Sequence, residues 1–405
     1  MSKKRICVLD TGKEWGGGTN SLMELLKRAD KKRYSFTALF YENYGMGDGP
    51  DVGSEIERLG VEFIHMKKSP VKLYAKGLKE AGRALFFFSR VLRKKYVFNI
   101  DRFSRIIPDS ERIAWVLKDG GFDLLYLNNQ PSSNLEGILA AASTGVPCVQ
   151  HSRIEVRLKP LEARLVNESV SRVICVSEGV RRGLVESGVR ADKCVVVYNG
   201  IDPSVMPGRK AELVRRELGL HADSVLIGTV GSLVERKRVN LLIEATARLK
   251  KTGDREVYCV IVGDGPEKGR LRKEAERLGA GDRVIFTGFS ADALSYMNAM
   301  DIFVTASRAE GLPRVILEAM LTSKPVIAFD IVGANELVAD GVTGLLLKDG
   351  GGKAIANAVK GIVGHGNKIK AFGSAGRRRV VESFGIERYV KGVEKVFEEV
   401  FSCST

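Results

Sequence analysis

Short apolar segments alternate with helical segments along the whole chain. "RICVLD" (5–10) and "DLLYLN" (123–128) in the first half, and "YCVIVGDG" (258–265) and "IFVTAS" (302–307) in the second, are almost continuously apolar. Strands that are buried on both faces have this composition, and stretches between them, such as 240–251, repeat apolar residues at helical spacing. The pattern predicts an α/β protein with parallel, doubly wound sheets covered by helices on both faces.

The series of strands and helices starts again near residue 205. The segment "NGIDPSVMPG" (199–208) contains two prolines and two glycines and is the predicted linker. A chain of 405 residues is long enough for two domains of roughly 150–200 residues each. We predict Rossmann-like domains at 1–203 and 204–383, and an amphipathic helix at 384–405 that crosses back to the N-terminal domain. Tandem domains of this kind are expected to bind ligands in a cleft at the carboxyl ends of both sheets.

The composition limits which cell compartment and which binding partners are expected for the chain. No apolar run approaches the roughly 20 residues of a membrane-spanning helix, and the run after the basic start ends at Asp10, so a cytoplasmic chain is expected. The six cysteines show no C-x-x-C spacing and are expected to be buried free thiols. The net charge of +15 suits nucleic acid, an anionic membrane or a phosphorylated small molecule, and charge alone does not choose between them.

Two turns are rich in glycine. Gly16, Gly17 and Gly18 lie between the first strand and a helix, where glycine allows backbone N–H groups to approach an anion. A phosphate-binding loop is the favoured interpretation, and a flexible turn is the alternative. The second turn, at Gly263 and Gly265, resembles a dinucleotide fingerprint only in part, because its spacing is G-x-G-x-x-x-G and it follows a later strand. There a tight turn lining the cleft is expected.

Two carboxylates bracket an apolar helix start in "AEGLPRVILEAM" (309–320). Glu310 falls on the loop after a strand, Pro313 suits a helix start, and Glu318 falls within the helix. The N–H groups of Arg314 and Val315 would be among the free donors of that helix. A ligand with sugar hydroxyls and phosphate would use all of these groups; the alternative is a helix with one acidic cap and one solvated glutamate.

This arrangement resembles the retaining glycosyltransferases of family 4 (glycosyl transferases group 1), which have the GT-B fold and the hallmark Glu, seven residues, Glu. The resemblance covers nearly the whole chain. The motifs that follow the family's order are "GGGTN", "VQHSR", "VVVYNGID", "GSLVERKRVNLLIEA", "VGDGPE", "VIFTGF" and the segment 307–347. The family implies a nucleotide-sugar donor, a UDP- or GDP-sugar, which is a substrate and not a cofactor.

The resemblance also implies roles for individual residues on the donor side. Glu310 would bond hydroxyls of the transferred sugar, and Glu318 the ribose of the nucleotide. Lys237 would hold the diphosphate together with the N–H groups of Arg314 and Val315. For Lys237 the alternative is a solvated lysine at a helix start.

Further roles fall on other segments. Gly17 and Gly18 would meet the phosphates, His151 would touch the sugar near the reacting carbon, and the backbone at Phe289 would meet the base. A buried histidine bonded to backbone is the alternative for His151.

One departure from the family concerns the diphosphate. The family usually has an arginine at the second position of the motif "G-R-L", five residues before the lysine, and this chain has Ser232 at that position. A guanidinium fork is therefore missing. Arg236 or Arg238 would have to compensate, or the site depends on Lys237 alone.

Acceptor contacts are predicted on the first domain. Asn128 and Asn129 end a strand that faces the cleft, and Arg153 and Arg157 follow His151. A solvated loop is an equally good interpretation for the two arginines.

The resemblance implies transfer with retention at the anomeric carbon, without a metal, in the synthesis of cell-surface polysaccharide or lipopolysaccharide. The acceptor would be a glycan or a lipid-linked sugar. The rival interpretations are a nucleotide-sugar epimerase of the same fold, a nucleic-acid-binding protein, for which no recognised module is present, and an inactive sugar-binding homologue.

Much of the positive charge lies between residues 67 and 95, with ten Lys or Arg and one acid, Glu80. A single helix from about residue 72 is expected, with an apolar face that packs on the N-terminal domain: Tyr74, Leu78, Ala81, Leu85, Phe88 and Leu92. Four further residues, Arg83, Phe86, Phe87 and Arg90, are predicted to dock the chain on the inner face of the cell membrane. The alternative is that a neighbouring loop covers both phenylalanines.

Overall fold

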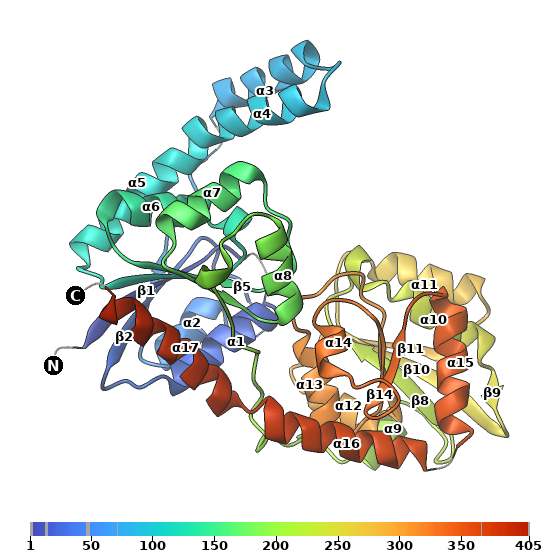
Figure 1. Cartoon of the computed structure of the whole chain (residues 1–405). Coiled ribbons are helices and arrows are strands. Elements are labelled where there is room, and N and C mark those ends of the chain that lie inside the picture. The colour runs from blue at the N-terminus through green and yellow to red at the C-terminus, as the bar shows by residue number, and fades with distance from the viewer. Residues whose placement is uncertain (1–2, 13–14, 46–48, 71, 366, 404–405) are drawn as a thin grey trace. The chain divides into compact units, whose positions relative to one another are not determined.

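In the computed structural model, which describes residues 3–12, 15–45, 49–70, 72–365 and 367–403, each half of the chain winds helices around its own parallel sheet (Figure 1). Unit 1 comprises Met1–Cys175, Arg181–Val197 and Val390–Thr405, and unit 2 comprises Val176–Val180 and Tyr198–Tyr389. The prediction of doubly wound α/β sheets is confirmed.

The sheet of unit 1 has the strand order β3-β2-β1-β4-β5-β6-β7, with all neighbours parallel. Its strands are β1 (Lys4–Asp10), β2 (Tyr34–Phe40), β3 (Glu62–His65), β4 (Leu124–Leu127), β5 (Cys148–Ser152), β6 (Arg172–Cys175) and β7 (Cys194–Val196). One face carries α1 (Gly17–Arg28) and α2 (Val52–Arg58), and the other carries α5 (Ile107–Asp119), α6 (Leu135–Thr144) and α7 (Pro160–Ser169) (Figure 1). The strand order reverses between β1 and β4, and this switch point is where sheets of this kind bind ligands.

The sheet of unit 2 repeats this topology in the order β11-β10-β8-β12-β13-β14. Its parallel strands are β8 (Val225–Val230), β10 (Arg255–Val262), β11 (Val284–Gly288), β12 (Ile302–Thr305), β13 (Val326–Phe329) and β14 (Gly344–Leu347), and the short β9 (Lys251–Thr252) pairs antiparallel with β10. One face carries α10 (Asn240–Arg248), α11 (Lys268–Arg277) and α15 (Gly351–Val363). The other carries α9 (Ala211–Glu217), α12 (Ala293–Ala299), α13 (Arg314–Leu321) and α16 (Lys368–Ser383). Here the switch point lies between β8 and β12.

Apolar strands fill the core because both of their faces are covered. In unit 2, Ile227, Ile261, Ile302 and Ile327 on four neighbouring strands are fully buried. Each such side chain contributes about 1.5–3 kcal/mol relative to its exposure to water. Further elements are the helices α8 (Glu178–Glu186) and α14 (Ala334–Leu337), the π-helical turn Arg102–Ile106, and the turns Pro131–Ser133, Ala191–Lys193 and Glu235–Lys237.

The last helix, α17 (Ile386–Ser402), is amphipathic as predicted. Tyr389, Val393, Val396 and Phe397 are all buried on one side. The Phe397 ring lies 5.9 Å from the Tyr34 ring and 5.5 Å from the Tyr126 ring, and Glu398 pairs with Arg33 at 2.6 Å. These contacts hold the end of the helix on the sheet of unit 1.

The basic segment does not form the single helix that was expected. It forms a hairpin of α3 (Leu73–Leu85) and α4 (Arg90–Asp101), which reaches away from the sheet of unit 1 (Figure 1). The predicted packing of its apolar face on the N-terminal domain is wrong, because most of that face is exposed: Tyr74, Leu78, Leu85, Phe88 and Leu92. The helix breaks at residues 86–89, where the side chain of Ser89 accepts a hydrogen bond from the N–H of Leu92 and caps α4.

Candidate active site

The loops that follow β8 and β12, on either side of the switch point in unit 2, carry opposite charges that meet. The ammonium group of Lys237 lies 2.7 Å from the Oε1 atom of Glu310, and the guanidinium of Arg236 lies 2.9 Å from the same atom. The side chains of Lys237 and Glu310 are only 19% and 10% exposed, whereas Arg236 is 44% exposed. The chain therefore brings Glu310 together with two adjacent predicted site residues, Arg236 and Lys237, that precede it by more than 70 positions.

The protonation state of Glu310 follows from these neighbours. Burial raises the pKa of its carboxyl, but the charges of Lys237 and Arg236 and a hydrogen bond from Lys237 outweigh burial, so the net pKa is below the ordinary value. Glu310 is therefore ionised at neutral pH. An ionised carboxylate is an acceptor that can hold sugar hydroxyls.

Arg238 fixes the two loops to each other. Its guanidinium donates to the carbonyl oxygens of Ala306 (2.7 Å) and Ser307 (3.3 Å) and lies 4.5 Å from the centre of the Phe329 ring. The backbone of Arg238 is left-handed, with φ of 47°. Arg238 is thus engaged inside unit 2, and Arg236 remains as the guanidinium that could compensate for Ser232.

Helix α13 begins beside this charge pair. The N–H of Ile316 donates to the carbonyl of Pro313. Arg314 and Val315 come before Ile316, so their N–H groups lie in the first turn of the helix, which carries a partial positive charge. Glu318 lies one turn further along the helix and is 19% exposed. Burial raises the pKa of its carboxyl, partly offset by the nearby Arg314 guanidinium.

Glycine turns close the same edge of the sheet. Gly263 has φ of 142° and lies against the backbone of Gly231, where a Cβ would overlap the carbonyl oxygen. The N–H of Gly263 donates to the carbonyl of Gly288 at 2.8 Å. Phe289, the predicted base contact, follows Gly288 and therefore lies beside the turn at Gly263. The Phe289 side chain is exposed.

We expect Ser232→Arg to tighten the binding of nucleoside diphosphates. Ser232 is partly exposed and follows Gly231. A Cβ at Gly231 would lie 3.9 Å from the Cε atom of Lys237, so this part of the loop lies beside the lysine side chain. A charge-assisted hydrogen bond is worth about 1.5–3 kcal/mol, which corresponds to an affinity gain of about tenfold or more. Isothermal titration calorimetry with UDP and GDP measures this, and Ser232→Ala should leave the affinity nearly unchanged. Equal or weaker binding by the arginine variant would show that Ser232 does not face the diphosphate.

Unit 1 has a buried polar network at its own switch point. Asp10, at the end of β1, accepts a bond from Asn128 Nδ2 at 2.6 Å, and Asn128 Oδ1 accepts from Arg153 Nη2 at 2.6 Å. Arg153 Nη2 also donates to the hydroxyl of Tyr126 at 3.3 Å, and that hydroxyl lies 2.5 Å from His151 Nδ1. All five side chains are buried. Arg153 therefore bonds Asn128 directly and is joined to His151 through Tyr126, and Asp10 ends the network; sequence reasoning missed Tyr126 and Asp10.

The network is compatible with a His151 ring that carries its proton on Nε2. The Tyr126 hydroxyl can donate its hydrogen to Nδ1 while its oxygen accepts a hydrogen bond from Arg153. Burial, reinforced by the charge of Arg153, lowers the pKa of His151 well below its ordinary value. A neutral imidazole that donates from Nε2 can hydrogen-bond a sugar oxygen.

The remaining predicted residues of unit 1 lie around this network. Asn129 Oδ1 accepts from the N–H of Thr11 at 2.7 Å, and Arg157 is exposed. Helix α1 begins at Gly17, and a Cβ at Gly18 would lie 3.7 Å from the side chain of Arg153. Residues 13 and 14 of this loop lie outside the described residues. The only sequence signal for Asp10 was a carboxylate at the end of the first strand.

We expect acid to destabilise the protein partly through His151. Its pKa is lowered in the folded state, so the unfolded chain binds the proton first; the stabilisation is present above about pH 6.5 and is lost as the pH falls. Between about pH 7.5 and about pH 5, the free energy of unfolding should fall by up to about 2 kcal/mol more in the wild type than in His151→Gln. Urea unfolding measures this difference. His221→Gln, at an exposed histidine, is the control and should follow the wild type; an equal slope for all three proteins would refute the prediction.

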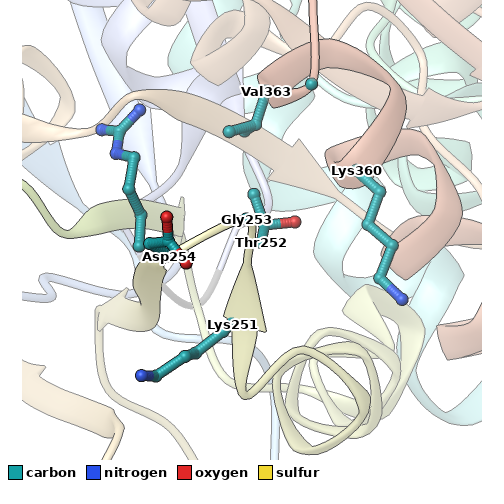
Figure 2. A pocket seen from close by; sticks show the side chains of 8 residues that line it. Lys251, Thr252, Gly253, Asp254, Lys360 and Val363 are labelled. Atoms are coloured by element: carbon teal, nitrogen blue, oxygen red, sulfur yellow. The ribbon is translucent and has the colours of Figure 1, made fainter.

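An open hollow lies at the opposite edge of the sheet in unit 2. It is lined by the β9–β10 turn, residues 251–255, and by the end of α15, residues 360–364 (Figure 2). Arg255 begins β10, whereas Gly263 follows its end, so this hollow contains none of the predicted site residues. Across the described residues, no group of three or more His, Cys, Asp or Glu side chains could hold a metal ion, and five of the free cysteines are buried.

The chain matches two family descriptions over most of its length. Residues 15–205 match Glycosyltransferase Family 4, and residues 210–379 match glycosyl transferases group 1. The chain belongs to this family of glycosyltransferases and has its GT-B fold. The resemblance drawn from the motifs is confirmed.

Two relatives have names that refer to lipopolysaccharide core and to a diphosphoundecaprenol-linked sugar. The chain is 31% identical over 216 residues to the lipopolysaccharide core biosynthesis glycosyltransferase LpsE of Rhizobium meliloti, a match that covers 53% of this chain and spans 60% of the relative's length. It is 27% identical to the UDP-Gal:alpha-D-GlcNAc-diphosphoundecaprenol alpha-1,3-galactosyltransferase of Escherichia coli, over 78% of this chain and 86% of the relative. The crystal structure of Anabaena HepE in complex with UDP-glucose matches with a TM-score of 0.77 at 23% identity, over 98% of this chain and 99% of that one. This structural similarity supports the fold.

Proposed function

We propose that the chain transfers a sugar from a nucleotide-sugar to a hydroxyl group of an acceptor, with retention at the anomeric carbon. The observation that carries the proposal is the ionised Glu310 held against Lys237, beside the first turn of α13 and at the switch point of the sheet of unit 2, where sheets of this kind bind ligands. A carboxylate for sugar hydroxyls and a cation for phosphate within 2.7 Å suit a ligand that carries both groups.

The proposed reaction exchanges one bond to the anomeric carbon for another. The bond from that carbon to the diphosphate oxygen breaks, and the electron pair remains on the phosphate. The acceptor oxygen bonds to the carbon on the same face, and the acceptor's proton goes to the departing phosphate oxygen. Lys237 and the N–H groups of Arg314 and Val315 stabilise the charge that develops on the diphosphate.

Other residues orient the donor in this proposal. Glu310 accepts hydrogen bonds from hydroxyls of the transferred sugar, and Glu318 from the ribose. His151, neutral and with its proton on Nε2, donates to a sugar oxygen near the reacting carbon. The turn at Gly17 and Gly18 adds backbone N–H groups for phosphate.

We propose a lipid-linked or glycan acceptor, handled on the cytoplasmic side of the cell membrane. The named relatives that act on lipopolysaccharide core and on a diphosphoundecaprenol-linked sugar support this choice. A UDP-sugar is the first donor to test, since the name of the Escherichia coli relative specifies UDP-Gal. Within the described residues no helix is long and apolar enough to cross a membrane.

The experiment is a panel of nucleotide-sugars screened by thermal stabilisation, followed by product analysis. A donor present at about 100 times its dissociation constant stabilises the folded state by about 2.7 kcal/mol. The stabilising donor is then incubated with acceptor, and the products are analysed by mass spectrometry and nuclear magnetic resonance. A new α- or β-linkage that matches the donor's anomeric configuration, together with free nucleoside diphosphate, supports the proposal. Epimerised donor without a new linkage would refute it.

A further inference from the structure

Exposed apolar side chains are concentrated on the α3–α4 hairpin. Nine of the nineteen large hydrophobic residues that are exposed in the described chain lie between residues 73 and 103. Four of them form what we call the hairpin tip, with exposed fractions of 65–77%: Leu85, Phe87, Phe88 and Val91. A cluster of exposed apolar side chains of this kind marks a binding surface, whereas exposed apolar residues that are scattered singly over a protein are ordinary.

Positive charge is concentrated on the same hairpin. Residues 72–105 contain ten Lys or Arg and two acids, Glu80 and Asp101, a net charge of +8 out of +15 for the whole chain. Four exposed cations lie within about two helical turns of the tip and are called the basic collar: Arg83, Arg90, Lys94 and Lys95. Arg83 pairs with Glu80, and both side chains remain more than half exposed.

The two helices hold each other firmly. Gly82 lies against the ring of Tyr96, where any Cβ would overlap it, and the rings of Phe86 and Tyr96 are 5.3 Å apart. Lys79 and Asp101 form an ion pair at 2.5 Å with side chains 15% and 28% exposed. The tip is therefore presented in one arrangement, and Phe86 belongs to the contact between the helices.

The base of the hairpin is tied to the rest of unit 1. Asp109 of α5, fully buried, accepts hydrogen bonds from the N–H and the hydroxyl of Ser69, at 3.0 and 2.6 Å. Lys159, the N-cap residue of α7, lies 5.3 Å from the ring centre of Phe98 on α4. A helix of 13 residues is about 20 Å long, so the tip is carried well away from the sheet (Figure 1).

We propose that the α3–α4 hairpin docks the chain on an anionic lipid surface. Leu85, Phe87, Phe88 and Val91 enter the region between headgroups and acyl chains, and the basic collar binds headgroup phosphates. Backbone hydrogen bonds close the turn, from Phe86 N to Gly82 O and from Ser89 N to Phe86 O, so these donors need no water at the interface. The net charge favours an anionic surface over a second copy, because two hairpins of net charge +8 repel each other.

The test is flotation of the full chain with lipid vesicles. Vesicles of phosphatidylcholine mixed with phosphatidylglycerol are compared with phosphatidylcholine alone, at low salt and at about 0.5 M salt. We expect binding to the anionic vesicles at low salt and much weaker binding to the neutral ones. The double variant Phe87→Ser, Phe88→Ser should bind at least tenfold more weakly, because two large apolar side chains are lost. The double variant Arg90→Gln, Lys94→Gln should lose roughly 25-fold, about fivefold for each cation.

Trp115→Ser is the matched control. Trp115 lies on α5 in the same unit, is 67% exposed and is outside the hairpin. It should bind vesicles as the wild type does. All variants should keep the thermal stabilisation by a nucleotide-sugar, since the substituted residues are exposed and lie outside the proposed site. This second readout separates failure of docking from failure of the proposed function.

Three outcomes would overturn the docking proposal. The first is wild-type protein that remains unbound to anionic vesicles at low salt. The second is an equal loss of binding in the tip variant and in Trp115→Ser. The third is a different occupant: a self-association of the wild type that the tip variant abolishes without any effect on vesicles, or a binding of duplex DNA that replaces binding to lipid.

Discussion

Glu310→Gln is expected to lower turnover about 10²- to 10³-fold while the protein remains folded. The carboxylate is ionised, only 10% exposed, and bonded to Lys237. Glutamine keeps the shape but removes the charge that strengthens hydrogen bonds to sugar hydroxyls as the anomeric carbon becomes positive. Losing one such preorganised interaction typically costs this factor in the rate constant. Steady-state kinetics with the donor found in the panel measures it.

Glu318→Gln is the matched comparison for this variant. Its proposed partner is the ribose, which does not change during the reaction, so KM for the donor should rise while kcat stays nearly constant. A Glu310→Gln enzyme with wild-type kcat, or one that changes only KM, would contradict the role given to Glu310. Far-ultraviolet circular dichroism and thermal melts check that both variants fold.

Lys237→Met is expected to lower kcat by about 10²-fold or more and to weaken binding of the nucleoside diphosphate. Methionine keeps an unbranched apolar stem and removes the ammonium charge that the proposal places on the departing diphosphate. It also removes the charge that depresses the pKa of Glu310. The acid limb of the pH–rate profile should therefore move to higher pH, because Glu310 then takes up its proton more readily.

Lys251→Met controls for the loss of a positive charge in the same unit. Lys251 is exposed and lies at the opposite edge of the sheet, beside the hollow in Figure 2. Its kinetics and its pH–rate profile should match those of the wild type. If Lys237→Met also matched the wild type in kcat, Lys237 would have no part in leaving-group stabilisation.

The sequence predicted much of the fold because the deciding information is local. Uninterrupted apolar strands, glycines at their carboxyl ends and an amphipathic last helix are all visible within windows of 8–17 residues. Gly263 belongs to this local pattern because its φ of 142° favours glycine, whereas the close approach of the Gly231 carbonyl is a tertiary contact that only the structure shows. The order of the motifs then led to the family and to Glu310, Glu318 and Lys237, whose catalytic roles remain predictions.

The hairpin shows where pattern reasoning fails. Apolar residues at helical spacing predicted a buried face, but periodicity records only which side chains share a face and not what covers it. Tyr74, Leu78 and Leu85 share that face and are exposed. The break after Leu85 was also missed, because contacts between the helices, such as that of Gly82 with Tyr96, show that the second helix folds back on the first, and these contacts leave no periodic pattern in the sequence.

By itself the sequence determined the α/β class, the family, and the Glu310 and Glu318 pair, because each depends on spacing along the chain. Only the tertiary structure decided which side chains meet across the strands. It showed Arg238 bound to the carbonyls of Ala306 and Ser307, and it joined Asp10 to His151 through a network with members on three strands. Residues more than 100 positions apart become neighbours only when β1 and β4 pair side by side, and hydrogen bonding between buried polar groups leaves no periodic trace in a sequence.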